Sequence, residues 1–308
     1  MKFLTISLFY FTLFYFSSPK EHAYVFKREA KKTDSSIIRI PFSLKLGKVS
    51  DVFVAETSKK IDSFYNKNIG TTGYYGSFIV AKNGKIIYEK YQGMANVKLQ
   101  KKMDENSALH LASVSKVLTA TAILKLVEND NIMLDQKVTD WLPDFPYKNT
   151  TIKTLLNHRS GLQHYSRFPE LMKNNWNRKK ILSNKDVYEL LVKNKFRLIT
   201  PDNTRFDYCN TNYIILALII EKATGLKYGA AMKELIFKPL KMNNTFVFDY
   251  YRDKDTVSMS YRNSVANPWD QFDNLYGDKN IYSTPRDLVK FDLGTYSPEF
   301  INQKLLKE

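Results

Sequence analysis

H-L-A-S-V-S-K-V-L-T-A, residues 110–120, opens the most strongly patterned helical segment of the sequence. Apolar residues continue from it at helical spacing, which predicts a helix from Ser113 to Glu128. Ser113 and Lys116 stand three residues apart at its start, so their side chains share one face. A serine hydroxyl becomes a good nucleophile when a base takes its proton, and a buried lysine can be that base. The stretch indicates an acylation site, and the alternative is an N-cap serine beside a solvent-exposed lysine.

A second polar element, D-Y-C-N at residues 207–210, leads directly into a long apolar helical pattern that Gly225 is expected to stop. Tyr208 can relay a proton between the lysine and the serine, and Asn210 can hydrogen-bond a substrate amide. The alternative interpretation is a core tyrosine and an N-cap asparagine. Neither element is specific alone, because S-x-x-K recurs at Ser17–Lys20 and Y-x-N at Tyr147–Asn149.

Six motifs in a fixed order carry more weight than either element alone. They are A-S-V-S-K-V-L-T-A around Ser113, L-D to W-L-P at 134–143, L-L-N-H-R-S-G-L at 155–162, D-Y-C-N at 207–210, P-L-K-M at 239–242 and Y-S-T-P-R-D-L at 282–288. Together they resemble the serine β-lactamase and penicillin-binding-protein clan. The resemblance is strongest to its class C β-lactamase and D-alanyl-D-alanine carboxypeptidase-like branch.

The resemblance implies an α+β fold, with an antiparallel sheet flanked by helices, an adjoining helical region, and the site between them. The residues themselves predict part of that sheet, because Asn83-Gly84 between two apolar runs is a strong hairpin signal. A helical pattern from Ser50 to about Tyr65 precedes the hairpin, with Phe64 among its apolar residues.

The resemblance also assigns roles to the polar residues. Ser113 would form a covalent ester, and its backbone N–H would supply half of an oxyanion hole. Lys116 and Tyr208 would act as general base and acid, and Asn210 would bind substrate.

The sequence departs from the family pattern in several places. Members carry an H-x-G or K-[ST]-G element on a strand beyond the S-T-x-x-D-L helix, and the printed sequence holds no match to it. We therefore expect the C-terminal strands to be missing and the activity to be weakened or lost, since one oxyanion donor typically accounts for about 100- to 1000-fold in turnover. Smaller departures are Arg159, Cys209 and Asn280.

The chain divides into three parts by composition. Residues 1–18 contain an apolar run of 14 residues, Phe3–Phe16, which predicts a signal peptide or an N-terminal anchor. Residues 19–48 are polar and basic and suggest a tether. Residues 49–308 form the predicted hydrolase domain, with a helical region at about 130–270. We expect an exported protein, periplasmic or secreted, with the leader as a membrane anchor if it is retained.

Composition limits which cofactors and partners we expect. The single cysteine, Cys209, excludes an internal disulfide, and the four histidines form no metal-binding motif, so we expect no metal and no cofactor. The formal net charge of +16 comes mainly from scattered lysines without a nucleic-acid-binding motif. We expect a small-molecule or peptidoglycan-peptide substrate, association with the cell-envelope surface, and no nucleic acid.

These observations predict a serine hydrolase that forms an acyl-enzyme on Ser113. Its substrate would be a peptidoglycan D-Ala-D-Ala peptide, a β-lactam or a small ester. The alternative is a non-catalytic protein of the same fold, whose crevice or +16 surface holds an anionic polymer of the cell envelope.

Overall fold

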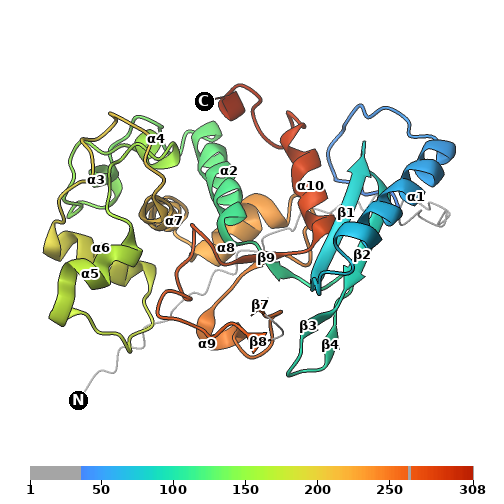
Figure 1. Cartoon of the computed structure of the whole chain (residues 1–308). Helices are drawn as coiled ribbons and strands as arrows, with labels where there is room; N and C mark the ends of the chain where they lie inside the picture. The colour runs from blue at the N-terminus through green and yellow to red at the C-terminus, as the bar shows by residue number, and fades with distance from the viewer. Residues whose placement is uncertain (1–35, 263–264, 308) are drawn as a thin grey trace, which may run out of the picture. The chain divides into compact units, whose positions relative to one another are not determined.

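The computed structural model describes residues 36–262 and 265–307, and within them the chain is α+β as predicted (Figure 1). The leader predicted at residues 1–18 and the first part of the predicted tether lie outside the described residues. In the described part, no helix has the length and apolar character needed to cross a membrane.

The predicted hairpin is confirmed and consists of β1 (Gly76–Lys82) and β2 (Lys85–Gln92). Asn83 and Gly84 have φ values of +51° and +73°, as a type I′ turn requires at both central positions. Helix α1 (Asp51–Asn68) lies along β2 and buries Tyr65 against the hairpin.

Residues 36–48, assigned to the tether from composition, lie against this hairpin. Ile38 N–H donates to the Gly84 carbonyl, and Ile86 N–H donates to the Ser36 carbonyl, both at 2.7 Å. The Ile38 side chain is buried in a small cluster with Ile86 and Leu293. This part of the chain therefore extends the folded domain, because its alternating isoleucines have apolar partners on the hairpin.

Short strands complete the β structure. A three-stranded antiparallel sheet joins distant parts of the chain in the order β5 (Leu109–His110), β9 (Ile281–Ser283) and β6 (Phe246–Val247). Two further pairs are β3 (Met94–Asn96) with β4 (Lys101–Lys102) and β7 (Tyr261–Arg262) with β8 (Val265–Ala266).

Most of the remaining helices lie away from the hairpin, whereas α10 (Pro285–Thr295) lies beside β1 (Figure 1). Their bounds are η1 (Ala112–Val114), α2 (Ser115–Glu128), α3 (Val138–Trp141), α4 (Ile152–Leu156), η2 (Tyr165–Arg167), α5 (Phe168–Met172), η3 (Lys173–Asn175), α6 (Asn184–Asn194), α7 (Asn210–Thr224), α8 (Tyr228–Met232), the π-helical η4 (Lys233–Phe237), α9 (Tyr250–Asp253), α10 (Pro285–Thr295) and η5 (Leu305–Lys307).

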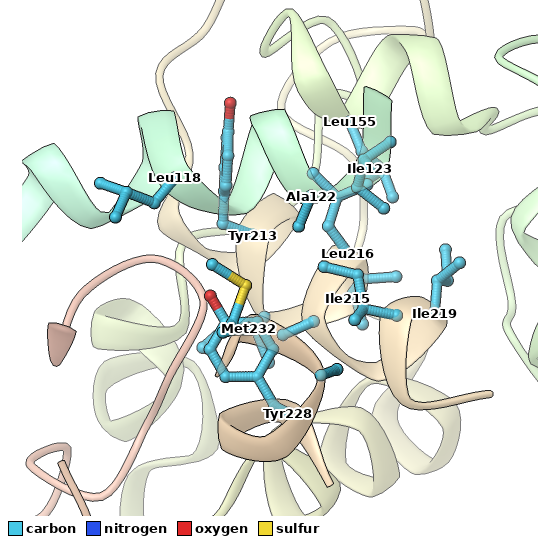
Figure 2. Packing of buried hydrophobic residues seen from close by; sticks show 14 of the residues in the cluster. Leu118, Ala122, Ile123, Leu155, Tyr213, Ile215, Leu216, Ile219, Tyr228 and Met232 are labelled. Carbon is cyan, nitrogen blue, oxygen red and sulfur yellow. The ribbon is translucent and has the colours of Figure 1, made fainter. Parts of the chain in front are cut away.

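Helix α7 is the centre of the main core and contacts α2, α4, α6 and α8. It is apolar on all sides, which is typical of a buried helix, and it ends at Gly225 in the predicted left-handed conformation. Figure 2 shows Ala122 and Ile123 of α2 facing Ile215 and Leu216 of α7. The packing of α2 on α7 fixes the direction of the segment that carries Ser113.

Candidate active site

Ser113 lies in a tight turn between β5 and α2. The N–H of Leu111 donates to the Ile281 carbonyl at 2.9 Å, and Ala112 then adopts a φ of +45°. This left-handed conformation is costly for a residue with a Cβ, and such residues gather at functional sites. The α-helix begins at Ser115, two residues later than predicted, and its N-cap is Val114. Ser113 is therefore not the N-cap, and it is exposed.

Lys116 lies one helical turn beyond Ser113 and is 5% exposed. Its Nζ donates to Ser113 Oγ at 3.2 Å and to the Asp278 carbonyl at 2.8 Å. The rings of Tyr208 and Tyr213 lie 5.1 and 5.8 Å from the same nitrogen. The alternative of a solvent-exposed lysine is therefore wrong, because this side chain is enclosed and directed at the serine.

Tyr208 reaches Ser113 from the segment that precedes α7. Its hydroxyl donates to Ser113 Oγ at 2.9 Å, and the side chain is 47% exposed. A core tyrosine would be buried, so that alternative is wrong as well. The structure thus brings three of the four predicted site residues together: both Lys116 and Tyr208 hydrogen-bond the same serine oxygen.

Asn210, the fourth predicted residue, is the first residue of α7. Its Oδ1 is buried and accepts no hydrogen bond from the described residues. The amide lies beside the Tyr165 hydroxyl, and no direct hydrogen bond joins Asn210 to Ser113 within the described residues. The N-cap position belongs to Cys209. A buried amide oxygen without a partner is uncommon, and it leaves Asn210 with an acceptor that the described residues do not use.

Asp278 is a site residue that the sequence did not reveal. It is fully buried, its carbonyl accepts from Lys116, and its Oδ2 accepts from the Tyr165 hydroxyl at 2.7 Å. Burial raises the pKa of this carboxyl above its usual value. Its partners lie far away in the sequence, so an aspartate in a short polar run carried no local signal.

The loop that contains Asp278 holds the start of α2 at three points. Thr119 Oγ1 donates to the Gly277 carbonyl at 2.7 Å, and the N–H of Ile281 donates to Ser115 Oγ at 3.1 Å. Together with the bond from Lys116, these contacts fasten one face of α2 to residues 277–281. The position of the lysine amine therefore depends on the shape of this loop.

His158 is the second residue that the sequence did not single out. Its Nδ1 accepts from the Cys209 N–H at 3.0 Å, and its side chain is buried. Burial, and then the charge of Lys116, lowers its pKa to about 4, so the imidazole is neutral at neutral pH. It is the histidine of the L-L-N-H-R-S-G-L motif, which was noted only as part of a family pattern.

The structure shows the local environment of all three smaller departures. Asn280 has a φ of +70°, a conformation that asparagine tolerates better than most residues, and its side chain donates to the Leu275 carbonyl at 2.8 Å. Arg159 donates to Asn203 through Nε at 2.9 Å. Cys209 is buried, and burial raises its pKa to about 11, which is typical of an inert thiol.

Metal chemistry has no candidate among the described residues. Within residues 36–262 and 265–307, no group of three or more histidine, cysteine, aspartate or glutamate side chains could hold a metal ion.

Sequence comparison relates the chain to the β-lactamase family and to penicillin-binding proteins. The Beta-lactamase family model matches residues 72–307. Penicillin-binding protein 4* of Bacillus subtilis is 33% identical over 246 residues, which is 75% of this chain and 54% of that protein. Teichoic acid D-alanine hydrolase of Staphylococcus aureus is 26% identical over 258 residues, 80% of this chain and 61% of that protein. The chain thus spans less than two thirds of the length of these relatives.

Comparison of structures gives the same relationship. The crystal structure of FmtA from Staphylococcus aureus superposes with a TM-score of 0.67 at 25% identity, over 85% of this chain and 73% of that chain.

Proposed function

Because this chain belongs to the β-lactamase family, we propose that it is a serine hydrolase that forms a covalent acyl-enzyme on Ser113. One observation carries the proposal: Lys116 Nζ and Tyr208 OH both lie within hydrogen-bond distance of Ser113 Oγ, at 3.2 and 2.9 Å. Nucleophile and base must be in such contact before a proton can move between them.

The first step is attack by Ser113. The Lys116 amine takes the proton of Ser113 Oγ, directly or through the hydroxyl of Tyr208. The oxygen then bonds to the substrate carbonyl carbon, and the carbonyl oxygen becomes an oxyanion. The Asp278 carbonyl accepts one N–H of Lys116, which holds the amine within hydrogen-bond distance of Ser113 Oγ.

The following steps return the proton and release the acyl group. The N–H of Ser113, near the positive end of α2, stabilises the oxyanion. The leaving amine or alkoxide takes a proton from Tyr208 or Lys116, the bond to it breaks, and the acyl group stays on Ser113. A water molecule then gives a proton to the base and bonds to the ester carbonyl carbon. The bond between Ser113 Oγ and the acyl carbon breaks, the base returns its proton to Oγ, and the acyl group leaves as a carboxylic acid.

We propose a substrate with a D-alanyl carbonyl or a similar small acyl group: a peptidoglycan D-Ala-D-Ala peptide, a β-lactam or a small ester. The names of the relatives support this range, since one is a penicillin-binding protein and another a D-alanine hydrolase. The unpartnered Oδ1 of Asn210 offers an acceptor for the amide N–H that a peptide or a β-lactam carries next to its reactive carbonyl.

Intact-mass spectrometry with a fluorophosphonate or penicillin probe tests the acyl-enzyme. We expect the full chain to gain the mass of one probe and Ser113→Ala to gain none. Ser166→Ala is the matched control, because Ser166 is an exposed serine whose hydroxyl contacts His164. A wild-type chain without an adduct, or an adduct that persists in Ser113→Ala, contradicts the proposal.

We also propose that residues 1–18 direct export and that the first part of the predicted tether connects this leader to the hydrolase domain. Residues 36–48 belong to the domain with residues 49–308, and its helical region lies at about 130–270. The apolar run Phe3–Phe16 supports export. N-terminal sequencing of the protein from envelope and secreted fractions tests this division. Recovery from the cytoplasm with an intact first residue would contradict it.

A non-catalytic envelope-binding role is the second candidate, and a basic groove favours it. This groove has a volume of about 1220 Å³ and is separate from the residues around Ser113. The cations along it are Lys227, Lys233, Lys238, Lys241 and Arg252. Its acidic residues are occupied internally: Glu221 accepts from the N–H of Tyr228, and Asp249 caps α9. A groove with several lysines suits an extended chain with spaced negative charges.

Retention on isolated envelope at increasing salt tests this second candidate. A charge-reversed variant, Lys233→Glu with Lys241→Glu, is expected to elute at lower salt, whereas Ser113→Ala should elute with the wild type. Lys185→Glu is the matched control, because Lys185 is an exposed lysine of α6 outside the groove. Elution that the groove variant leaves unchanged contradicts envelope binding through the groove.

A further inference from the structure

His158 hydrogen-bonds the backbone on both sides of Tyr208. Its carbonyl accepts from the Asp207 N–H at 2.7 Å, and its Nδ1 accepts from the Cys209 N–H at 3.0 Å. The residue between these two donors is Tyr208. One residue thus fixes the backbone immediately before and immediately after the tyrosine.

The His158 ring also packs on the Tyr208 ring. The two ring centroids lie 4.5 Å apart with their planes inclined by 34°, and the ring of Tyr213 lies 5.2 Å away. Tyr208 is itself 47% exposed, and besides the imidazole its ring has Lys116 Nζ at 5.1 Å. The hydroxyl of this ring donates to Ser113 Oγ.

The backbone at His158 is held in an uncommon conformation. Its φ is +55°, the left-handed region that few residues with a Cβ adopt, and it follows the end of α4. The surrounding contacts must offset the free-energy cost of this conformation. Such conformations cluster at functional sites. Here the conformation directs both the carbonyl and the imidazole at one short segment.

The electrostatic setting keeps the imidazole in the form that these contacts need. Lys116 and the phenols of Tyr208 and Tyr213 are the titratable groups against the ring. Since Nδ1 accepts from Cys209, the ring proton lies on Nε2. A neutral imidazole beside Lys116 therefore adds no second positive charge next to the Tyr208 hydroxyl.

We propose that His158 is a positioning residue, which aims the Tyr208 hydroxyl at Ser113 by hydrogen-bonding the neighbouring backbone and packing on the phenol ring. The proposal rests on the proposed function only in the use made of Tyr208. The placement of the ring can be measured without any reaction.

Three substitutions separate the effect of the hydrogen bond from Cys209 N–H from that of the ring packing on Tyr208. His158→Ala removes both the ring and the acceptor, and His158→Asn restores an acceptor close to the Nδ1 position. His158→Phe keeps a ring and leaves the Cys209 N–H without its partner. His164→Asn is the control, because His164 is a partly buried histidine whose Nδ1 also accepts a backbone N–H, that of Ser166.

The first readout is the second-order rate constant for acylation by a fluorophosphonate. We expect His158→Ala to lower it by about 10- to 100-fold, the size of effect that a displaced catalytic group produces. His158→Asn should recover most of the loss, His158→Phe should lie between the two, and the control should match the wild type. If His158→Asn is as slow as His158→Ala while both remain folded, the hydrogen-bonded placement is wrong.

The second readout is the ¹⁹F NMR signal of 3-fluorotyrosine introduced at Tyr208. Packing against the imidazole should shift this signal from that of free fluorotyrosine, and His158→Ala should move it toward the free value. A signal that stays in place overturns the proposal, even in a protein that no probe acylates. A wild-type chain that resists acylation, with the signal moving as expected, instead contradicts the proposed function alone. Should His158→Ala fail to fold, His158→Phe and His158→Asn carry both readouts.

Discussion

At the scale of single residues, Tyr208 is the most direct test of the chemistry. Tyr208→Phe removes the hydroxyl that donates to Ser113 and keeps the ring that packs on His158. We expect acylation by a fluorophosphonate to slow about 100-fold or more, as loss of a general acid or base typically does.

Tyr251→Phe is the control for this substitution, because Tyr251 is 69% exposed and lies on α9, outside the site. The free energy of unfolding should differ little between the two variants. An acylation rate in Tyr208→Phe equal to that of the wild type would exclude the tyrosine from the proton path.

The sequence alone pointed to Ser113, Lys116 and Tyr208 because their two short motifs stand among six motifs that follow one another in the order of a known family. It did not identify His158 or Asp278, because these act through contacts between segments that lie far apart. The bond from His158 to Cys209 spans 51 positions, and that from Lys116 to the Asp278 carbonyl spans 162. Only the folded chain brings such partners together.

At the scale of elements, two glycine substitutions test how tightly the loop at residues 277–281 is packed against α7. Gly277 lies in this loop, and Gly225, which ends α7, is the control. Gly277 has a φ of +95°, and an added Cβ would lie 2.3 Å from the Tyr213 carbonyl oxygen. Gly225 has a φ of +68° with nothing within 4 Å of the same position. Gly225→Ala should cost about 1 kcal/mol of unfolding free energy, from backbone conformation alone.

Gly277→Ala should cost about 3 kcal/mol or more, because backbone strain and a collision with α7 add together. It should also slow acylation of Ser113, since the shifted loop carries the carbonyl that holds Lys116. Urea unfolding and the fluorophosphonate rate measure the two effects. Equal losses of stability in both glycine variants would show that the close approach to α7 is not what constrains the loop.

Element boundaries were largely predictable, and buried faces less so. The pattern that predicted a helix from Ser50 to about Tyr65 is confirmed by α1. Its apolar residue Phe64 is nevertheless 56% exposed, whereas Tyr65 is fully buried. The tyrosine packs on Phe78 and donates its hydroxyl to Gln92, partners that a hydrophobicity pattern does not contain.

At the scale of the whole molecule, the ordered motifs were enough to predict the fold class. Each motif marks a segment of a known architecture, and their order sets the connections between segments. Composition was a poorer guide, because it separated residues 36–48 from the domain, whereas Ile38 packs on the hairpin. Charge and polarity describe the surface of such a segment and miss the apolar residues that alternate through it.

The pH dependence of global stability should report on His110, which joins β5 to the loop before β9. Its Nε2 accepts from the Asn280 N–H at 3.3 Å, and its ring packs on Tyr282. Burial, and then the charge of Lys279, lowers its pKa from 6.5 to about 4 in the folded protein. The unfolded chain therefore binds a proton that the folded protein does not bind between these two values. The free energy of unfolding must fall as the pH is lowered through that window.

His110→Phe keeps a ring against Tyr282 and cannot be protonated, so its stability should lose this part of the pH dependence. Urea unfolding from pH 7.5 to 4.5 gives the free energy of unfolding of each protein. The value for the wild type minus that for the variant should fall by at most about 3 kcal/mol as the pH is lowered. The raised pKa of Asp278 acts in the opposite sense, because burial makes its carboxylate less favourable as the pH rises. That contribution is common to both proteins and cancels in the difference. Parallel stability curves would therefore mean that His110 gains its proton as readily in the folded protein as in the unfolded chain.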